Sequence, residues 1–292
     1  MQKVGFIGLG NMGKGMAQNL SKNNIQISGF DVDKTVFNNL KDNKIKQEKS
    51  LETLVRNSEV LITMLPDGPI VKKVWEELIS LSDQDKIIID CSTIDVETSL
   101  QVQKLANSKG IKTLDAPVSG GVMGADDGTL TFMVGGNFDT YSNCKYLFDI
   151  MGKNSILCGE IGAGQSAKIC NNMLLASTMI AVGESFNLAN NLGLNLEKLF
   201  EVLSTSSGSC WAINNYCPYE GIGPDSPADK NYKGGFATSL MFKDLSLAIA
   251  AAKSSGTRVN YGLQSQKSYA KLVADGHADL DFSCIVKKLL PN

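Results

Sequence analysis

Short apolar runs alternate with helical segments over the first 160 residues of this 292-residue chain. Each run is bounded by polar or turn-forming residues, as expected for buried strands. Strands that alternate with helices in this way predict an α/β domain whose sheet is of the parallel type. The runs occupy residues 4–7, 25–30, 60–65, 87–91, 111–117, 130–134 and 155–158.

Beyond residue 163 the strand-like runs nearly cease and helical periodicity takes over. We therefore predict two domains, residues 1–162 of α/β type and residues 163–292 all-helical, linked by a long helix. Residues 205–236 are rich in Ser, Gly, Pro, Asn and Tyr. They predict a long irregular segment, and such segments within compact domains are often functional. The helical patterns cover residues 165–192, 196–204, 240–255, 259–274 and 281–289.

The first strand-like run leads directly into a glycine-rich turn, Gly8-Leu9-Gly10-Asn11-Met12-Gly13. A helical segment follows, and then a second run that ends at Asp31. This is the strand–glycine–helix–strand–acid order of a Rossmann-type dinucleotide-binding domain. Gly8 permits the tight turn, Gly10 lets the backbone approach a pyrophosphate, and Gly13 lets the helix pack closely on the strand. The alternative is an ordinary strand–helix turn with structural glycines.

Asp31 lies 18 residues after Gly13, where a carboxylate can accept hydrogen bonds from the hydroxyls of the adenine ribose. The same charge repels the 2′-phosphate of NADP. No arginine occurs between residues 30 and 55. These features predict NAD as the cofactor.

Composition narrows the class of protein. The net charge is −2 without a basic block, which gives no support to a nucleic-acid or membrane-surface partner. The seven cysteines are scattered without a Cys-x-x-Cys pair, as in reduced, cytoplasmic proteins. His277 is the only histidine, so a histidine metal cluster is excluded and no metal site is predicted. The base of any reaction is therefore expected to be a lysine, a carboxylate or a tyrosine.

Two further motifs carry candidate chemistry. Ser119-Gly120-Gly121 follows a strand-like run, and the amide groups of such a turn can bind a small carboxylate; the alternative is a purely structural turn. A second glycine cluster, residues 159–164, precedes a long helical pattern and suggests a hinge. That pattern places Lys168 and Asn172 one turn apart on an otherwise apolar face. Burial would lower the pKa of such a lysine and suit it to exchange a proton with a hydroxyl group. The alternative is a lysine whose stem covers the core while its amine reaches solvent.

These motifs resemble those of the β-hydroxyacid dehydrogenase family, and the matching segments follow in order over nearly the whole chain. The resemblance implies NAD(P)-dependent oxidation of a 3-hydroxy acid to its semialdehyde. The segments 206–211 and 231–236 favour 3-hydroxyisobutyrate, an intermediate of valine catabolism. The longer matching segments are 5–13, 115–121, 164–173 and 241–245, and the shorter ones are 64–66, 92–95, 130–136, 206–211 and 231–236.

The resemblance also implies roles for individual residues. Lys168 is the expected catalytic base, and Ser119, Gly120, Gly121 and Asn172 are expected to bind the substrate. One position departs from the pattern, because close relatives often carry Asn where Ile70 stands. The expected cofactor-binding residues are Gly8, Gly10, Asn11, Met12, Gly13, Asp31, Leu65, Pro66, Thr93, Phe236 and Lys243.

Other functions of the same fold remain as alternatives. Within the family these are tartronate semialdehyde reductase and the succinic semialdehyde or glyoxylate reductases. Imine reductases usually replace the catalytic lysine, and scaffold proteins of this fold have lost it, whereas Lys168 is present here. As in relatives, we expect a homodimer or homotetramer.

Overall fold

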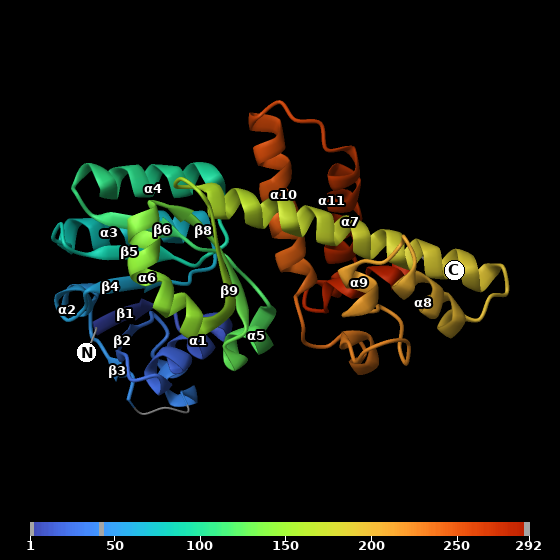
Figure 1. The fold of residues 1–292 in the computed structure, drawn as a ribbon, viewed down its shortest axis with the longest axis horizontal. Coiled ribbons are helices and arrows are strands. Elements are labelled where there is room, and N and C mark those ends of the chain that lie inside the picture. The colour runs from blue at the N-terminus through green and yellow to red at the C-terminus, as the bar shows by residue number, and fades with distance from the viewer. Residues whose placement is uncertain (1–2, 41–43, 289–292) are drawn as a thin grey trace. The chain divides into compact units, whose positions relative to one another are not determined.

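The structure is a computed structural model that describes residues 3–40 and 44–288. Its contacts divide the chain into two compact units, Met1–Lys168 and Ile169–Asn292. The division falls inside helix α7 (Ala163–Asn191), the long yellow-green helix of Figure 1. The domain boundary predicted at residues 162 and 163 lies at the start of this helix and stays a prediction.

The first unit is built on one nine-stranded sheet, which confirms the predicted α/β class. Its path runs β3-β2-β1-β4-β5-β6-β8-β7, and β9 pairs with β8. Strands β1 to β6 are parallel to one another, so their carboxyl ends meet at one edge. The strands are β1 (Lys3–Ile7), β2 (Gln26–Phe30), β3 (Lys46–Gln47), β4 (Val60–Thr63), β5 (Ile87–Asp90), β6 (Lys112–Asp115), β7 (Val118–Ser119), β8 (Leu130–Gly136) and β9 (Gly152–Gly159).

The prediction of a parallel sheet is wrong for one part of it. Strand β8 is antiparallel to both β6 and β7. The segment between β6 and β8 forms β7 and the seven-residue helix α5 (Gly121–Asp127) instead of the long crossover helix that a parallel neighbour requires. Strand β9 does follow a crossover helix, α6 (Phe138–Met151), and it is parallel to β8.

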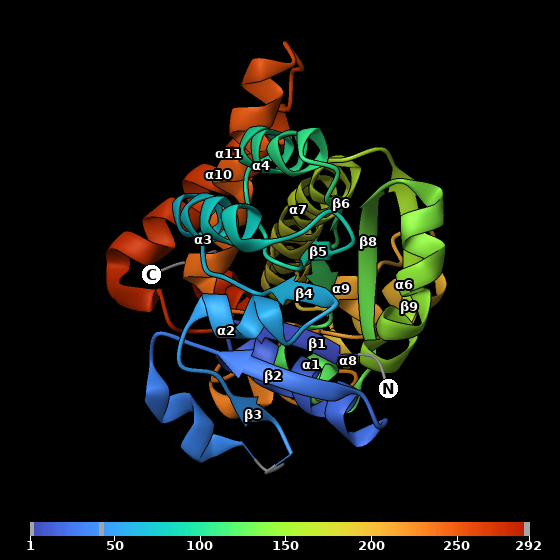
Figure 2. The same cartoon turned by 90° about the vertical axis from the view of Figure 1, so that its left-hand side faces the viewer.

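Helices cover both faces of this sheet (Figure 2). On one face α1 (Asn11–Lys22), α5 and α6 pack on a core that includes Phe6, Leu20 and Phe148. On the other face α2 (Leu51–Arg56), α3 (Gly68–Leu81) and α4 (Val96–Ser108) bury Trp75 and Leu78. The starts of α2, α3 and α4 are fixed by the side chains of Ser50, Asp67 and Asp95, which accept hydrogen bonds from backbone amides of the first turn.

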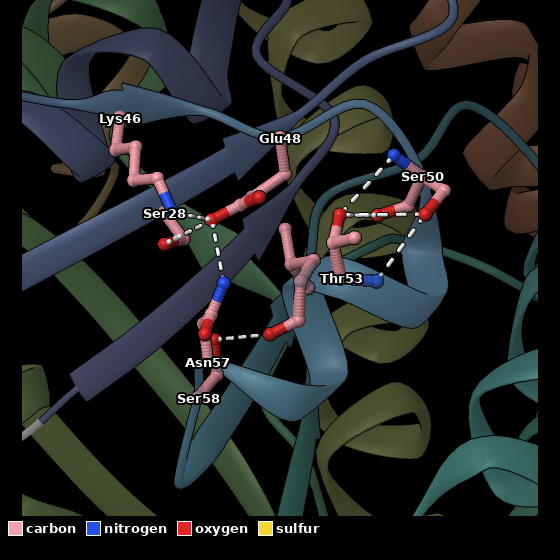
Figure 3. Close-up of polar contacts among 8 residues, drawn as sticks. Ser28, Lys46, Glu48, Ser50, Thr53, Asn57 and Ser58 are labelled. Carbon is pink, nitrogen blue, oxygen red and sulfur yellow. Dashed lines mark hydrogen bonds and ion pairs between the residues drawn. The ribbon is translucent and has the colours of Figure 1, made fainter.

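A buried carboxylate joins β2, β3 and α2 (Figure 3). Oε1 of Glu48 accepts hydrogen bonds from Ser28 Oγ at 3.1 Å and from Asn57 Nδ2 at 3.0 Å, and it pairs with Lys46 Nζ at 2.7 Å. Burial opposes the ionised form, but the hydrogen bonds from Lys46, Asn57 and Ser28 outweigh it and lower the pKa of Glu48. The short strand β3 is therefore secured beside β2, whose last residue precedes Asp31.

The second unit is helical, as predicted, and its core gathers Phe186, Tyr269 and Phe282. Two details differ from the prediction. Residues 205–236 contain the short helices α9 (Trp211–Asn214) and Pro227–Lys230, and the expected α-helix over 281–289 is a 3₁₀ helix over Phe282–Lys288, with residue 289 outside the described residues. The other helices are α8 (Leu196–Thr205), α10 (Thr238–Ser254), α11 (Asn260–Leu272) and the π-helical turn Val273–His277. In the described part of the chain, none of the helices combines the length and apolar character needed to span a bilayer.

Candidate active site

The glycine turn after β1 has the geometry that its sequence predicts. Gly8 has φ +90°, and a Cβ there would collide with the carbonyl oxygen of Met64. A Cβ on Gly13 would collide with the carbonyl oxygen of Gly8. Among the described residues, a Cβ placed on Gly10 would meet no atom within 4 Å from outside its own stretch of chain. Gly8 and Gly13 are thus required by packing, whereas Gly10 leaves one side of the backbone accessible to a ligand.

Helix α1 begins within this glycine-rich segment, with the exposed Gly10 as its N-cap and the exposed Asn11 as its first residue. Met12 is half-buried against the core of the first face. The first turn of α1 contains no acidic residue, so its positive end is not neutralised from within the helix. The turn fits a dinucleotide pyrophosphate, which binds where amide groups at a helix N-terminus are accessible.

Asp31 lies beside the glycine turn at the end of β2. Its Oδ2 accepts a hydrogen bond from the Leu9 amide at 2.7 Å, and its Oδ1 accepts one from the Asp33 amide at 2.9 Å. These contacts fix the half-buried carboxylate next to the Gly8–Gly10 backbone. The position agrees with the predicted role in binding the adenine ribose.

The loops after β4 and β5 meet at the same edge of the sheet. The half-buried Leu65 donates its amide to Ser92 Oγ at 2.8 Å, and exposed Pro66 follows it. Thr93 is half-buried between Ser92 and Ile94. The predicted cofactor-bordering residues of the first unit therefore lie on adjoining loops.

Asp90 is buried beneath these loops. Its Oδ1 accepts hydrogen bonds from Thr63 Oγ1 at 2.8 Å and from the Ser92 amide at 3.1 Å. Trp75 donates in turn to Thr63 Oγ1 at 3.1 Å. Burial raises the pKa of Asp90 to about 6, although hydrogen bonds from Ser92 and Thr63 act in the opposite direction.

The predicted carboxylate-binding turn lies at the start of α5. Ser119 ends β7 and is half-buried, and the two glycines that follow have φ of +134° at Gly120 and +64° at Gly121. Only glycine adopts these conformations without strain. The exposed Gly120 and the half-buried Gly121 turn the backbone sharply after the serine hydroxyl, which is compatible with binding a small anion.

The start of α7 is attached to the carboxyl end of β6 through Asp115, which is fully buried. Its Oδ1 accepts from the Gly162 amide at 2.7 Å and its Oδ2 accepts from the Gln165 amide at 2.9 Å. Gln103 also donates to Oδ1, at 3.0 Å. The first turn of α7 consequently lies at the edge of the sheet that carries the glycine turn.

Lys168 follows one turn later and is 6% exposed. On the same side of α7, Ala176 and Met179 are buried and Leu175 is half-buried, in agreement with the predicted apolar face. A lysine this deeply buried differs from the alternative, in which the amine would reach solvent. The burial suits a proton-exchanging amine, and the catalytic role itself stays a prediction.

In the second unit, Asn172 is buried and its Nδ2 donates to Oδ2 of Asp244 at 2.5 Å. Asp244 is itself buried on α10, and its Oδ1 lies 3.8 Å from Nζ of the preceding Lys243. The structure thus brings together Asn172 and Lys243, two predicted site residues that are far apart in the sequence. Phe236 lies elsewhere in the unit, half-buried, with its ring 5.9 Å from that of Phe282.

Three polar residues of these sites were not selected from the sequence. Gln165, on α7, is fully buried and its side chain bonds the loop after β5, Asp244 is the acceptor for Asn172, and the buried Asp281 accepts from the Phe236 amide at 2.7 Å. The spacing of Gln165 from Lys168, three residues on one helix, was a usable signal. Asp281 had none, because it follows a polar turn and is the first residue of the predicted helical pattern 281–289.

Two family descriptions cover almost the whole chain. Residues 3–159 match the NAD binding domain of 6-phosphogluconate dehydrogenase, and residues 162–289 match the NAD-binding domain of NADP-dependent 3-hydroxyisobutyrate dehydrogenase.

Full-length relatives agree with these matches. The probable 3-hydroxyisobutyrate dehydrogenase of Mycobacterium bovis is 42% identical over 99% of this chain and 98% of its own length. The mitochondrial 3-hydroxyisobutyrate dehydrogenase of Drosophila melanogaster is 41% identical over 97% of this chain and 88% of its own length. A solved structure of the Mycobacterium tuberculosis 3-hydroxyisobutyrate dehydrogenase with L-serine has a TM-score of 0.95 and 42% identity, covering 99% of each chain.

Proposed function

Because the chain belongs to the 3-hydroxyisobutyrate dehydrogenase family of NAD(P)-dependent oxidoreductases, we propose that it oxidises 3-hydroxyisobutyrate to methylmalonate semialdehyde with NAD. The observation that carries this proposal is the buried Lys168 on a helix whose start is anchored to the carboxyl edge of the sheet. That edge is where ligands of open α/β sheets bind.

NAD would be held by residues of the glycine turn and its neighbours. Amide groups at the start of α1 would bind the pyrophosphate, and Asp31 would accept hydrogen bonds from the adenine ribose. Leu65, Pro66 and Thr93 would border the cofactor. Phe236 and Lys243 are the cofactor contacts that we propose for the second unit. NAD supplies the acceptor for the hydride when it is bound.

The substrate would be held through its carboxylate by Ser119, Gly120 and Gly121. Lys168, in its neutral form, would accept the proton of the 3-hydroxyl group while the hydride leaves the carbon that bears this hydroxyl. Asn172 would orient the hydroxy acid beside the amine. Holding both groups in reacting geometry supplies much of the acceleration.

The two predicted domains would divide these tasks, with residues 1–162 binding the cofactor and residues 163–292 contributing to substrate binding and to assembly. We further propose a homodimer or homotetramer. Large apolar side chains are exposed near the end of α7 and on α8: Leu188 is 61% exposed, Leu192, just after α7, 76% and Val202 58%. Apolar surface that is exposed on an isolated chain can be buried in a subunit interface. Light scattering coupled to size exclusion measures the subunit number.

A cytoplasmic location is the third part of the proposal. It is supported by the seven cysteines, all free thiols in the structure, since disulfides are rare in reducing compartments. Fractionation of the source cells, followed by detection of the protein, tests this location.

A substrate panel tests the reaction. We expect 3-hydroxyisobutyrate with NAD to give the highest kcat/KM, measured as NADH absorbance. 2-Methyl-1-propanol, which has a methyl group in place of the carboxylate, should be a poor substrate. L-serine belongs in the panel because a similar solved structure holds it. Faster reduction of tartronate semialdehyde, succinic semialdehyde or glyoxylate would replace the proposed substrate with one of these.

A further inference from the structure

We propose that Gln165 is a positioning residue whose side-chain amide holds the loop after β5 against the first turn of α7. The loop carries Thr93, and the helix carries Lys168. This inference rests on the proposed function, because it takes Thr93 as a cofactor contact and Lys168 as the base. Gln165 would keep the cofactor-binding loop and the base at a fixed spacing.

The side chain of Gln165 bridges the loop with both ends of its amide group. Nε2 donates to the carbonyl oxygen of Ser92 at 2.7 Å, and Oε1 accepts from the amide of Ile94 at 3.1 Å. These two backbone groups flank Thr93, and Ser92, Ile94 and Gln165 are all buried. A single side chain thus supplies the donor and the acceptor that two buried backbone groups require.

The backbone of the same helical turn is fixed from another direction. The amides of Gly162 and Gln165 donate to the two oxygens of Asp115, at the end of β6. A Cβ on Gly164 would lie 2.8 Å from the Asp115 carbonyl oxygen, so the turn packs directly on the strand. The first turn of α7 is therefore tied to β6 through its backbone and to the loop after β5 through the Gln165 side chain.

Lys168 is three residues after Gln165, and residues three apart are neighbours on a helix surface. A shift of the loop relative to this turn would move Thr93 relative to the lysine amine. Because hydride and proton leave adjacent atoms of the substrate, a misplacement of about 1 Å can lower the rate by about 10²-fold. Loss of the two hydrogen bonds of the Gln165 side chain is thus expected to affect cofactor binding and turnover together.

Two substitutions separate a positioning role from simple packing. In Gln165→Met the side chain keeps its approximate size but loses both hydrogen bonds. In Gln165→Glu the introduced group can still accept from the Ile94 amide, and it can donate to the Ser92 carbonyl only while it is protonated. Burial and the Asp115 carboxylate, which accepts from the backbone amide of the same residue, favour the protonated form of that group, whereas Lys168 on the same helix favours the ionised form.

The experiment measures two quantities between about pH 5.5 and pH 8.5: the NADH dissociation constant, by fluorescence, and kcat for hydroxy-acid oxidation and for semialdehyde reduction. Each is expressed as the ratio of the variant's value to that of wild type at the same pH. For Gln165→Met we expect NADH affinity to fall at least about threefold, and kcat to fall about 10- to 100-fold, throughout this range. For Gln165→Glu we expect near-wild-type ratios at the acidic end and a loss comparable to Gln165→Met at the alkaline end. The matched control is Gln18→Met, which removes a buried glutamine of α1 whose Nε2 has no hydrogen-bond partner among the described residues.

Recovery of Gln165→Glu toward wild-type ratios at low pH distinguishes a positioning role of the Gln165 side chain from a general effect on folding. The melting temperature of each variant is measured alongside. Ratios for Gln165→Glu that do not change with pH, or NADH binding and kcat unchanged in Gln165→Met, would overturn the inference. NADH binding requires no hydroxy acid, so this readout is separate from the proposed reaction. Wild-type protein that binds NADH but oxidises none of the hydroxy acids would contradict the proposed function alone.

Discussion

Asn172 on α7 donates its side-chain amide to Oδ2 of Asp244 on α10 at 2.5 Å, and both residues are buried. The contact gives Asn172 a fixed orientation. Its amide oxygen accepts from Asn171 Nδ2 at 3.0 Å on the other side. A site residue expected to orient the substrate is therefore held by a carboxylate that belongs to another helix.

We expect Asn172→Ala to lower both activity and stability. A hydrogen bond to a charged group contributes about 1.5–3 kcal/mol, and its loss leaves the buried Asp244 with one donor fewer. The KM for the hydroxy acid should rise about 10-fold or more, and the melting temperature should fall. Asn190→Ala, on the exposed end of the same helix, is the control and should change neither quantity. An unchanged KM in a destabilised Asn172→Ala protein would show that the residue only joins the helices.

Replacement of the lysine is expected to remove the chemistry and leave cofactor binding. Lys168→Ala should lower kcat by about 10²–10⁴-fold, the usual range for loss of a general base. NADH affinity should stay within a few fold of wild type, because the glycine turn lies elsewhere in the first unit.

Kinetics at saturating substrate give kcat of the Lys168→Ala protein, and fluorescence titration gives its affinity for NADH. Lys198→Ala serves as the control, since this exposed lysine pairs with Glu201 on α8. Turnover by a folded Lys168→Ala protein within a few fold of wild type would exclude the residue as the base.

Local patterns were sufficient to predict much of this fold. The apolar runs identified the longer strands, and the glycine turn with Asp31 at the end of the next strand identified the Rossmann arrangement. Strands β3 and β7 are two residues long each, too short for any periodicity. The reversed direction of β8 depends on its pairing with β6 and β7, which no local pattern encodes.

Buried polar residues were the main gap in the site. In a sequence, Gln165 and Asp244 have the appearance of solvent-facing positions of a helix. Their burial is decided by backbone and side-chain groups that arrive from distant segments, Ser92 and Ile94 for the glutamine and Asn172 for the aspartate. Lys168 was selected as a candidate because it stands on an apolar face beside recognisable motifs.

Asp90 should give the first unit a distinct pH dependence of stability. Its pKa is raised to about 6 by burial, so the folded protein retains a proton that the unfolded chain, with a pKa near 3.8, has already released. The stability associated with the protonated form is present below the unfolded pKa and is lost as the pH rises toward 6. Asp90→Asn cannot ionise and should not show this loss.

The measurement is urea unfolding of wild type and Asp90→Asn at about pH 4.5 and pH 7. The difference in unfolding free energy between the two proteins should shift in favour of the variant by about 2 kcal/mol between these pH values. Taking the difference cancels groups common to both proteins. A difference that is the same at both pH values would show that Asp90 does not titrate in this interval.

The hydrogen bond from the Leu9 amide to Asp31 predicts the cofactor preference. It fixes a negative charge beside the glycine turn at 2.7 Å from the backbone, where the adenine ribose of a bound dinucleotide should lie. Like charges a few ångströms apart near a protein surface repel by about 1–4 kcal/mol. We therefore expect kcat/KM to be about 10- to 10³-fold higher with NAD than with NADP.

Two substitutions and a control isolate the charge. Asp31→Asn keeps an oxygen that can accept from the Leu9 amide but loses the charge, so it should narrow the preference for NAD over NADP. Asp31→Arg should reverse this preference. Asp33→Ser is the matched control, because it also removes one negative charge, two residues after Asp31. The Asp33 carboxylate is exposed and accepts hydrogen bonds from the amide and the hydroxyl of Thr35. The effect of Asp33→Ser on the ratio of kcat/KM with NAD to kcat/KM with NADP should be small at an ionic strength of about 0.15 M, where exposed charges are screened within about 8 Å. Equal kcat/KM with the two cofactors in the unmutated protein would show that the Asp31 carboxylate does not contact the ribose.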